Sequence, residues 1–78
     1  MLKFVLFKND DREIQYIYYP EGGTNPGIVS YDKREGVCNI VTLSKDDECR
    51  TYALKMFSRL RKYAETGTFK EEGMIAWY

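Results

Sequence analysis

Residues 44–67 read SKDDECRTYALKMFSRLRKYAETG, and this stretch decides the fold. Apolar side chains recur in it at steps of three and four residues. On a helix that turns about 100° per residue, they fall within one arc of about 140°. They are Cys49, Tyr52, Ala53, Met56, Phe57, Leu60, Tyr63 and Ala64. The pattern predicts one amphipathic helix, and the apolar face of this helix must be buried against another element.

Both ends of this stretch carry helix-end signals. Ser44 can cap the first turn, and the acidic residues 46–48 place negative charge near the positive end of the helix dipole. Gly67 suits the left-handed backbone conformation that often follows a helix. We therefore predict a helix of about 20 residues that starts at Ser44, spans about 30 Å and ends at Gly67.

The rest of the chain is typical of short strands separated by polar turns. Four strands are predicted before the helix and one after it, at 2–7, 13–19, 28–32, 37–43 and 74–78. Polar turns at 9–12 and 33–36 indicate that the strands they connect pair antiparallel. The longest loop, 20–27, holds three glycines and two prolines. It is either a mobile hairpin loop or a binding loop, and both interpretations stay open.

The predicted fold class is α+β: a four-stranded antiparallel meander, one amphipathic helix packed on one sheet face, and a C-terminal fifth strand. Residues 2–7 are apolar at nearly every position, which indicates an interior strand with neighbours on both sides. We therefore expect the fifth strand to pair with the first, which gives the order 5-1-2-3-4. The alternative places the fifth strand beside the fourth. Residues 1–78 form a single domain.

Composition limits the classes of partner. Lys plus Arg and Asp plus Glu each number 12, so the net charge is zero. Such a balance gives no long-range attraction to nucleic acid or to an anionic membrane. The apolar run Phe4–Phe7 is too short for a signal peptide or a membrane span, so we expect a cytoplasmic protein without membrane contact. A domain this small has thin stability, which favours self-association.

The residue types favour a non-enzymatic role. Histidine, the most frequent general base, does not occur in the chain, and the two cysteines lack the spacing of metal ligands. We therefore expect no catalytic residues, no cofactor and no metal. Cys49 falls on the apolar arc of the helix, which predicts a buried, inert thiol. Cys38 and Cys49 are expected to lie too far apart for a disulfide bond.

One helix covers only one face of a five-stranded sheet, so the other face is expected to expose aromatic side chains. The candidate interaction residues are Tyr16, Tyr18, Tyr31 and Trp77, and Phe7 is a further aromatic on the strands. The alternative is that tyrosine simply suits strands, with its ring half buried and its hydroxyl in water. We predict a protein-interaction module that forms a homodimer through the sheet face or an edge strand.

Five basic residues follow one another on the predicted helix with no acid between residues 50 and 62. They are Arg50, Lys55, Arg59, Arg61 and Lys62. One interpretation is a solvated face whose charges help the helix dipole and whose aliphatic stems cover apolar surface. The alternative is contact with an anionic partner. The second functional hypothesis is therefore a single-stranded nucleic-acid-binding domain that stacks bases on sheet aromatics beside these basic residues.

Overall fold

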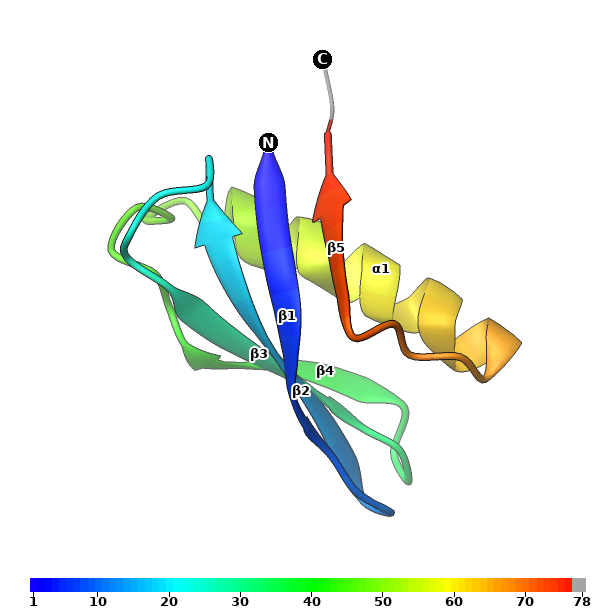
Figure 1. Cartoon of the computed structure of the whole chain (residues 1–78). Coiled ribbons are helices and arrows are strands. Elements are labelled where there is room, and N and C mark those ends of the chain that lie inside the picture. The colour runs from blue at the N-terminus through cyan, green and yellow to red at the C-terminus, as the bar shows by residue number, and fades with distance from the viewer. Residues whose placement is uncertain (77–78) are drawn as a thin grey trace.

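The structure, a computed structural model, describes residues 1–76. One five-stranded sheet and one helix make up this part of the chain (Figure 1). The elements are β1 (Leu2–Asn9), β2 (Glu13–Pro20), β3 (Gly27–Asp32), β4 (Val37–Thr42), α1 (Thr51–Thr66) and β5 (Glu72–Ile75). The sheet order is β4-β3-β2-β1-β5, and every neighbouring pair is antiparallel. The predicted α+β meander with its fifth strand beside the first is confirmed, and the alternative order is wrong.

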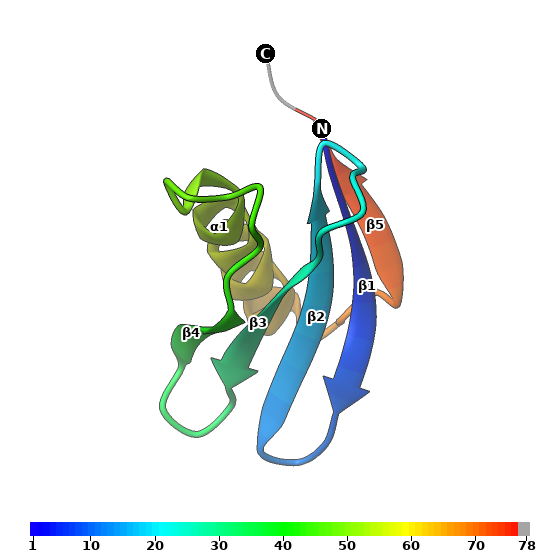
Figure 2. The same cartoon turned by 90° about the vertical axis from the view of Figure 1, so that its left-hand side faces the viewer.

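The helix α1 packs against one face of the sheet and leaves the other face bare (Figures 1 and 2). The spacing of its apolar residues explains this position, because its buried residues recur one turn apart and form a single stripe. They are Ala53, Met56, Leu60 and Tyr63. Alternate strand residues meet this stripe, since successive side chains of a strand point to opposite faces. These are Leu2, Phe4, Ile14, Tyr16, Tyr18 and Val29, which together with the helix stripe form one core.

Two glycines in the strands make room for aromatic rings of the core. A Cβ atom on Gly27 would lie 2.3 Å from the ring of Tyr18, and one on Gly73 would lie 2.5 Å from the ring of Phe4. Each glycine is the direct cross-strand partner of the residue whose ring approaches it. The missing side chain therefore lets each ring lie against the neighbouring strand, a known use of glycine in sheets.

The prediction that Tyr16 and Tyr18 lie on an interaction surface is wrong. Both side chains are fully buried between the sheet and α1. Their hydroxyl groups still find partners, because Tyr16 donates to the carbonyl oxygen of Lys70 at 2.6 Å and Tyr18 donates to the Asp47 carboxylate at 3.2 Å. Burial raises the pKa of both phenols, so they stay protonated donors. The large rings fill the space beneath the helix without leaving an unpaired polar atom.

The helix begins at Thr51, seven residues after the predicted start at Ser44. Arg50 has φ 60°, a left-handed conformation that a helix cannot continue through. The cap comes from Asp47, whose buried carboxylate accepts the backbone N–H groups of Tyr52 at 3.0 Å and Ala53 at 2.9 Å. Because Cys49 precedes the helix, it is exposed, and the prediction of a buried thiol is wrong.

The C-terminal end of the helix agrees with the sequence pattern. Gly67 adopts φ 75°, and its backbone N–H donates to the carbonyl oxygen of Tyr63 at 2.8 Å. The chain then returns to the sheet as β5, which starts at Glu72, two residues before the predicted strand. Residues 77 and 78, the last two of that predicted strand, lie outside the described residues.

Candidate interaction surface on the uncovered side of the sheet

The face of the sheet that points away from α1, here called the outer face, is formed by strand residues that alternate with the core residues. Within residues 1–76, no other element covers it (Figure 2). Its members are Lys3, Val5, Lys8, Glu13, Gln15, Ile17, Tyr19, Ile28, Ser30, Asp32, Val37, Asn39, Thr42, Glu72 and Met74. The outer face therefore mixes aliphatic side chains with charged and amide side chains, unlike the core face.

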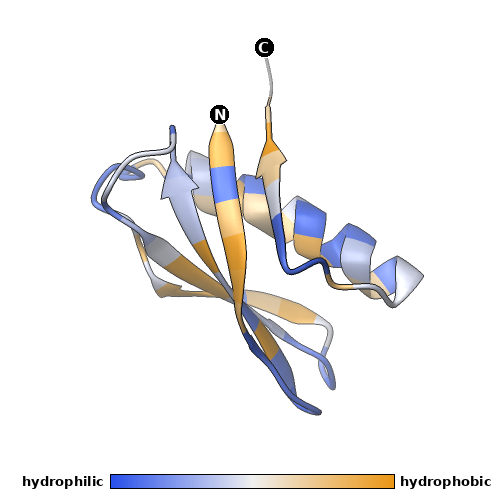
Figure 3. Cartoon of the chain, viewed as in Figure 1, coloured by the Kyte–Doolittle hydropathy of each residue, from blue (hydrophilic) through white to orange (hydrophobic). Residues whose placement is uncertain are grey.

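A row of aliphatic residues crosses the middle of the outer face. Val5 on β1 lies opposite Ile17 on β2, and Ile17 lies opposite Ile28 on β3. Val5 is 42% exposed, while the two isoleucines are half buried by their neighbours. Figure 3 shows that the hairpin ends are hydrophilic and that the hydrophobic residues lie along the strands. The apolar surface outside the core is thus concentrated on the sheet.

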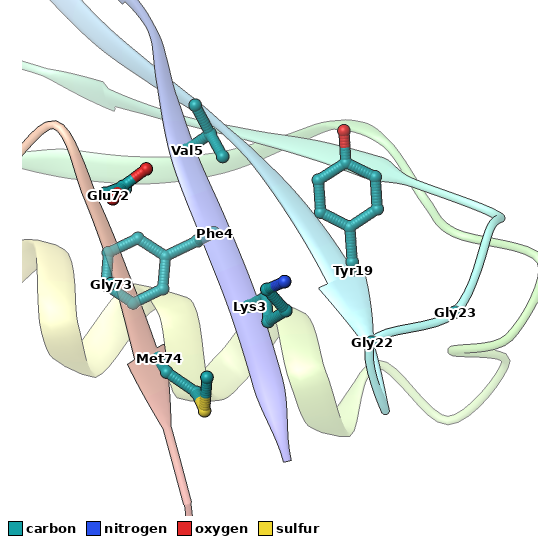
Figure 4. A pocket seen from close by; sticks show the side chains of 9 residues that line it. All are labelled: Lys3, Phe4, Val5, Tyr19, Gly22, Gly23, Glu72, Gly73 and Met74. Atoms are coloured by element: carbon teal, nitrogen blue, oxygen red, sulfur yellow. The ribbon is translucent and has the colours of Figure 1, made fainter.

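A shallow depression with a volume of about 570 Å³ lies at the corner formed by β5, β1 and the loop after β2 (Figure 4). It is lined by Lys3, Phe4, Val5, Tyr19, Gly22, Gly23, Glu72, Gly73 and Met74. Figure 4 shows Tyr19, Lys3 and Met74 on neighbouring strands around this depression. The lining combines one ammonium group, one carboxylate and apolar surface, which suits contact with another amphipathic surface.

The two edges of the sheet differ in how well they are protected. The β5 edge is only four residues long, and it begins with Glu72 and Gly73. The β4 edge has six residues, VCNIVT, with no charge, no proline and no glycine. Val37 and Val41 on it are 46% and 53% exposed. Natural edge strands avoid association by being short, charged, bulged or interrupted by proline. β4 carries one register irregularity at Val41 and none of the other features, so it is the edge better suited to pairing.

Three of the residues expected to form the interaction surface, Tyr16, Tyr18 and Tyr31, lie on the helix side of the sheet. Tyr31 is half buried on the helix side, where its ring lies 6.3 Å from that of Phe69, and Trp77 lies outside the described residues. The outer face instead uses Ile17 and Tyr19, which the sequence pattern did not single out. Glu13 and Gln15 could have indicated them, because alternate residues of β2 share a face and these two are polar.

The five basic residues lie on α1 or at its start, on the side of the sheet opposite the outer face. Arg50, Lys55, Arg61 and Lys62 are exposed, and Arg59 is half buried. None of them lies in the last turn of the helix, so the helix dipole does not account for the series. The buried Tyr16 and Tyr18 cannot stack bases beside them. The basic residues and the sheet aromatics therefore do not form one joint site.

The shifted pKa values of Asp10 and Cys38 are explained by hydrogen bonds in a turn and by burial, respectively. Asp10 accepts the backbone N–H groups of Glu13 and Arg12, and these bonds lower the pKa of the Asp10 carboxyl. Burial raises the pKa of the Cys38 thiol, which keeps the thiol in its less nucleophilic form. Among residues 1–76, no group of three or more His, Cys, Asp or Glu side chains is placed to hold a metal ion.

Comparison with known proteins adds no relative. No protein-family model, no curated protein and no solved structure matches this chain. In the part of the chain that the structure describes, no helix is long and apolar enough to cross a membrane. The function therefore has to be inferred from the residues and geometry described above.

Proposed function

We propose that this chain is a small, non-enzymatic protein-interaction module that acts as a homodimer through its sheet. One observation carries the proposal: large apolar side chains that the helix leaves exposed gather on the strands. Val5, Phe7, Val37, Val41 and Met74 all belong to β1, β4 or β5. Two of them, Val37 and Val41, share the β4 edge, and neighbouring exposed apolar side chains mark an interaction surface more often than scattered ones do.

A second copy is the partner that the chain itself supports. The net charge of zero means that two copies do not repel each other at long range. A domain of 78 residues gains much from burying additional surface, since its own core is small. Twofold homodimers are the commonest oligomers of soluble proteins.

The non-enzymatic part of the proposal is supported by the states of the reactive groups. The pKa of the Asp10 and Asp32 carboxyls is lowered, so neither is tuned to exchange a proton near neutral pH. The raised pKa of the Cys38 thiol disfavours the thiolate. Cys38 and Cys49 are both free thiols, which fits the proposed cytoplasmic location because that compartment keeps thiols reduced.

Single-stranded nucleic-acid binding is the second candidate function. It is supported by the exposed Arg50, Lys55, Arg61 and Lys62 along α1. It is weakened by the burial of Tyr16 and Tyr18, because stacking platforms must be accessible to bases. We therefore rank it below the homodimer.

Light scattering behind a sizing column tests the proposed function. At micromolar concentration we expect a mass twice that of one chain. The same sample is then titrated into a fluorescent single-stranded oligonucleotide at low and high salt. A single-chain mass at all concentrations rejects the homodimer. A single-chain mass together with salt-sensitive oligonucleotide binding puts the second candidate in its place.

A further inference from the structure

We infer that the homodimer forms by strand addition, with β4 of one copy pairing antiparallel to β4 of a second copy about a twofold axis at Asn39. The two five-stranded sheets then join into one continuous sheet. This inference rests on the proposed homodimer and specifies where its contact lies. Strand addition at a sheet edge is a common recognition mode, in which backbone hydrogen bonds supply much of the affinity.

The exposed edge of β4 is the first reason. Its neighbour β3 pairs with it on one side only, so the outward backbone N–H and C=O groups of β4 have no strand partner within residues 1–76. The strand contains no lysine, glutamate, proline or glycine that would discourage pairing. The other edge, β5, is shorter and begins with Glu72, so it is less suited to pairing with a second copy. The contact between the β4 strands of the two copies is called the seam below.

The sequence of β4 is the second reason, because residues 37–41 read VCNIV and are nearly symmetric about Asn39. Antiparallel pairing about a twofold axis at Asn39 places Val37 opposite Val41 of the second copy. It also places Cys38 opposite Ile40 of the second copy. Valine pairs then flank the axis on the outer face, where cross-strand β-branched pairs stabilise a sheet.

Asn39 itself faces Asn39 of the second copy on the axis. A carboxamide carries both donors and an acceptor, so two of them can bond to each other. Sliding the seam by two residues would place each asparagine opposite a valine and lose that bond. Asn39 thus selects one register, the role that a single polar residue plays in other symmetric interfaces. The register shift between Ile40 and Thr42 leaves Val41 without a partner on β3, so the seam ends at this residue.

Stacking of the two outer faces is the competing contact, and it is less favourable. Five strands spaced about 4.8 Å apart and about six residues long span about 24 by 20 Å, so two stacked faces bury about 1,000 Å² in total. A five-residue strand seam alone buries less than this, so area does not decide between the two contacts. Stacking is disfavoured because it would remove from water the charges of Lys3, Glu13 and Glu72. Pairing through β4 leaves these charges solvated.

The helix flank above β4 adds apolar surface beside the seam. The Cys38 sulfur lies 3.9 Å from the carbonyl oxygen of Phe57, which places this flank of α1 over β4. Leu54, one turn earlier on the same flank, is 56% exposed. Cys38 and Ile40, which are half buried in one copy, become covered by the same residues of the second copy.

Disulfide trapping tests the register of the seam. The background carries Cys38→Ser and Cys49→Ser, and its mass is measured first. Oxidised glutathione is then added to Asn39→Cys and, as the matched control, to Val41→Cys. On the axis, the two thiols introduced at position 39 are close enough to bond, whereas positions 41 of the two copies lie about 13 Å apart along the seam. We expect loss of the monomer band on a non-reducing denaturing gel for Asn39→Cys only.

Lysine substitution tests the edge itself. Val37→Lys with Val41→Lys is expected to halve the mass without changing the melting curve of the single chain, because both sites are exposed. Val5→Lys on the outer face, with similar exposure, is expected to keep the dimer mass.

The outcomes of these two experiments separate the seam from the dimer. If the parent is a dimer but Val5→Lys dissociates it and the β4 lysines do not, the β4 seam is wrong and the homodimer is retained. The same conclusion follows if a dimeric parent gives no disulfide with Asn39→Cys. A parent that is monomeric throughout overturns both.

Discussion

The two faces of β2 differ in what covers them, although the same eight residues build both. On the helix side, Ile14, Tyr16 and Tyr18 are fully buried. On the outer face, Ile17 and Tyr19 are half buried beside polar neighbours. The helix covers the face with two of the three tyrosine rings of β2, and their hydroxyl groups reach acceptors at the margin of the core. The outer face of β2 carries Ile17 and Tyr19 together with the polar Glu13 and Gln15, a mixture that tolerates water.

The difference between the two faces implies that stability and association depend on separate parts of the sheet. The helix-side face closes the core, so substitutions there should act mainly on folding. The outer face and the β4 edge stay accessible, so substitutions there should act mainly on association. The first of four sets of variants tests this division directly, and the other three test a core contact, the helix cap and the turns.

The largest effect is expected at Leu60, which is fully buried in the helix stripe. Leu60→Ala should lower the free energy of unfolding by about 2–5 kcal/mol, because it removes buried methyl groups and leaves a cavity. Val5→Ala on the outer face is the control and should change it by about 0.5 kcal/mol or less. Urea unfolding followed by circular dichroism measures both. Similar losses for the two variants would contradict the division of the faces.

The next effect concerns Gly73 and the ring of Phe4. Gly73→Ala should cost about 1–3 kcal/mol, because the new methyl group overlaps the ring. In a Phe4→Leu background the same change should cost much less, since the ring is gone. A double-mutant cycle from four unfolding curves measures this coupling. An equal cost in both backgrounds would show that the ring contact is not the reason for glycine at this position.

A smaller effect is expected at Asp47, which caps α1 from the preceding loop. Asp47→Ala should cost about 1–2 kcal/mol, because the N–H groups of Tyr52 and Ala53 lose their acceptor. Asp46→Ala, at an exposed neighbouring carboxylate, should stay within about 0.5 kcal/mol. Thermal unfolding of the two variants compares them. If the Asp46 variant lost as much, the loop and not the cap would be responsible.

The smallest effect is a pH dependence from the two hairpin turns. Backbone N–H groups of Glu13 and Glu35 lower the pKa of Asp10 and Asp32 below the ordinary carboxyl value of 3.8. The associated stability is therefore present above about pH 4 and is lost as pH falls through the lowered pKa values. Replacing both residues by Asn keeps an acceptor oxygen but removes the titration. Melting temperatures of the double variant should fall less on acidification than those of the parent, and an identical fall would exclude this role.

The topology could be predicted from the sequence because the decisive signals are local. The apolar residues of β1 marked it as an interior strand, and the periodicity around Leu60 marked the helix. The helix start could not be predicted in the same way. The positive φ of Arg50 and the long reach of Asp47 to Tyr52 depend on how the loop crosses the sheet.

The interaction surface was harder to predict than the fold. Both faces of β2 carry apolar side chains, so its pattern did not show which face the helix would cover, and a one-residue change of register exchanges the faces. The glycine contacts at positions 27 and 73 depend on residues of neighbouring strands and leave no local signal. The uncharged composition of β4, in contrast, was visible in the sequence and gained its meaning from its edge position.

Small-angle X-ray scattering at micromolar concentration tests the homodimer most directly. One copy has a Cα radius of gyration of 11.4 Å. Two copies joined through β4 have centres about five strand spacings, or about 24 Å, apart, which raises the radius to about 17 Å. We predict this larger radius together with twice the single-chain forward scattering. A radius close to that of one copy, with single-chain forward scattering at every concentration, would contradict the homodimer.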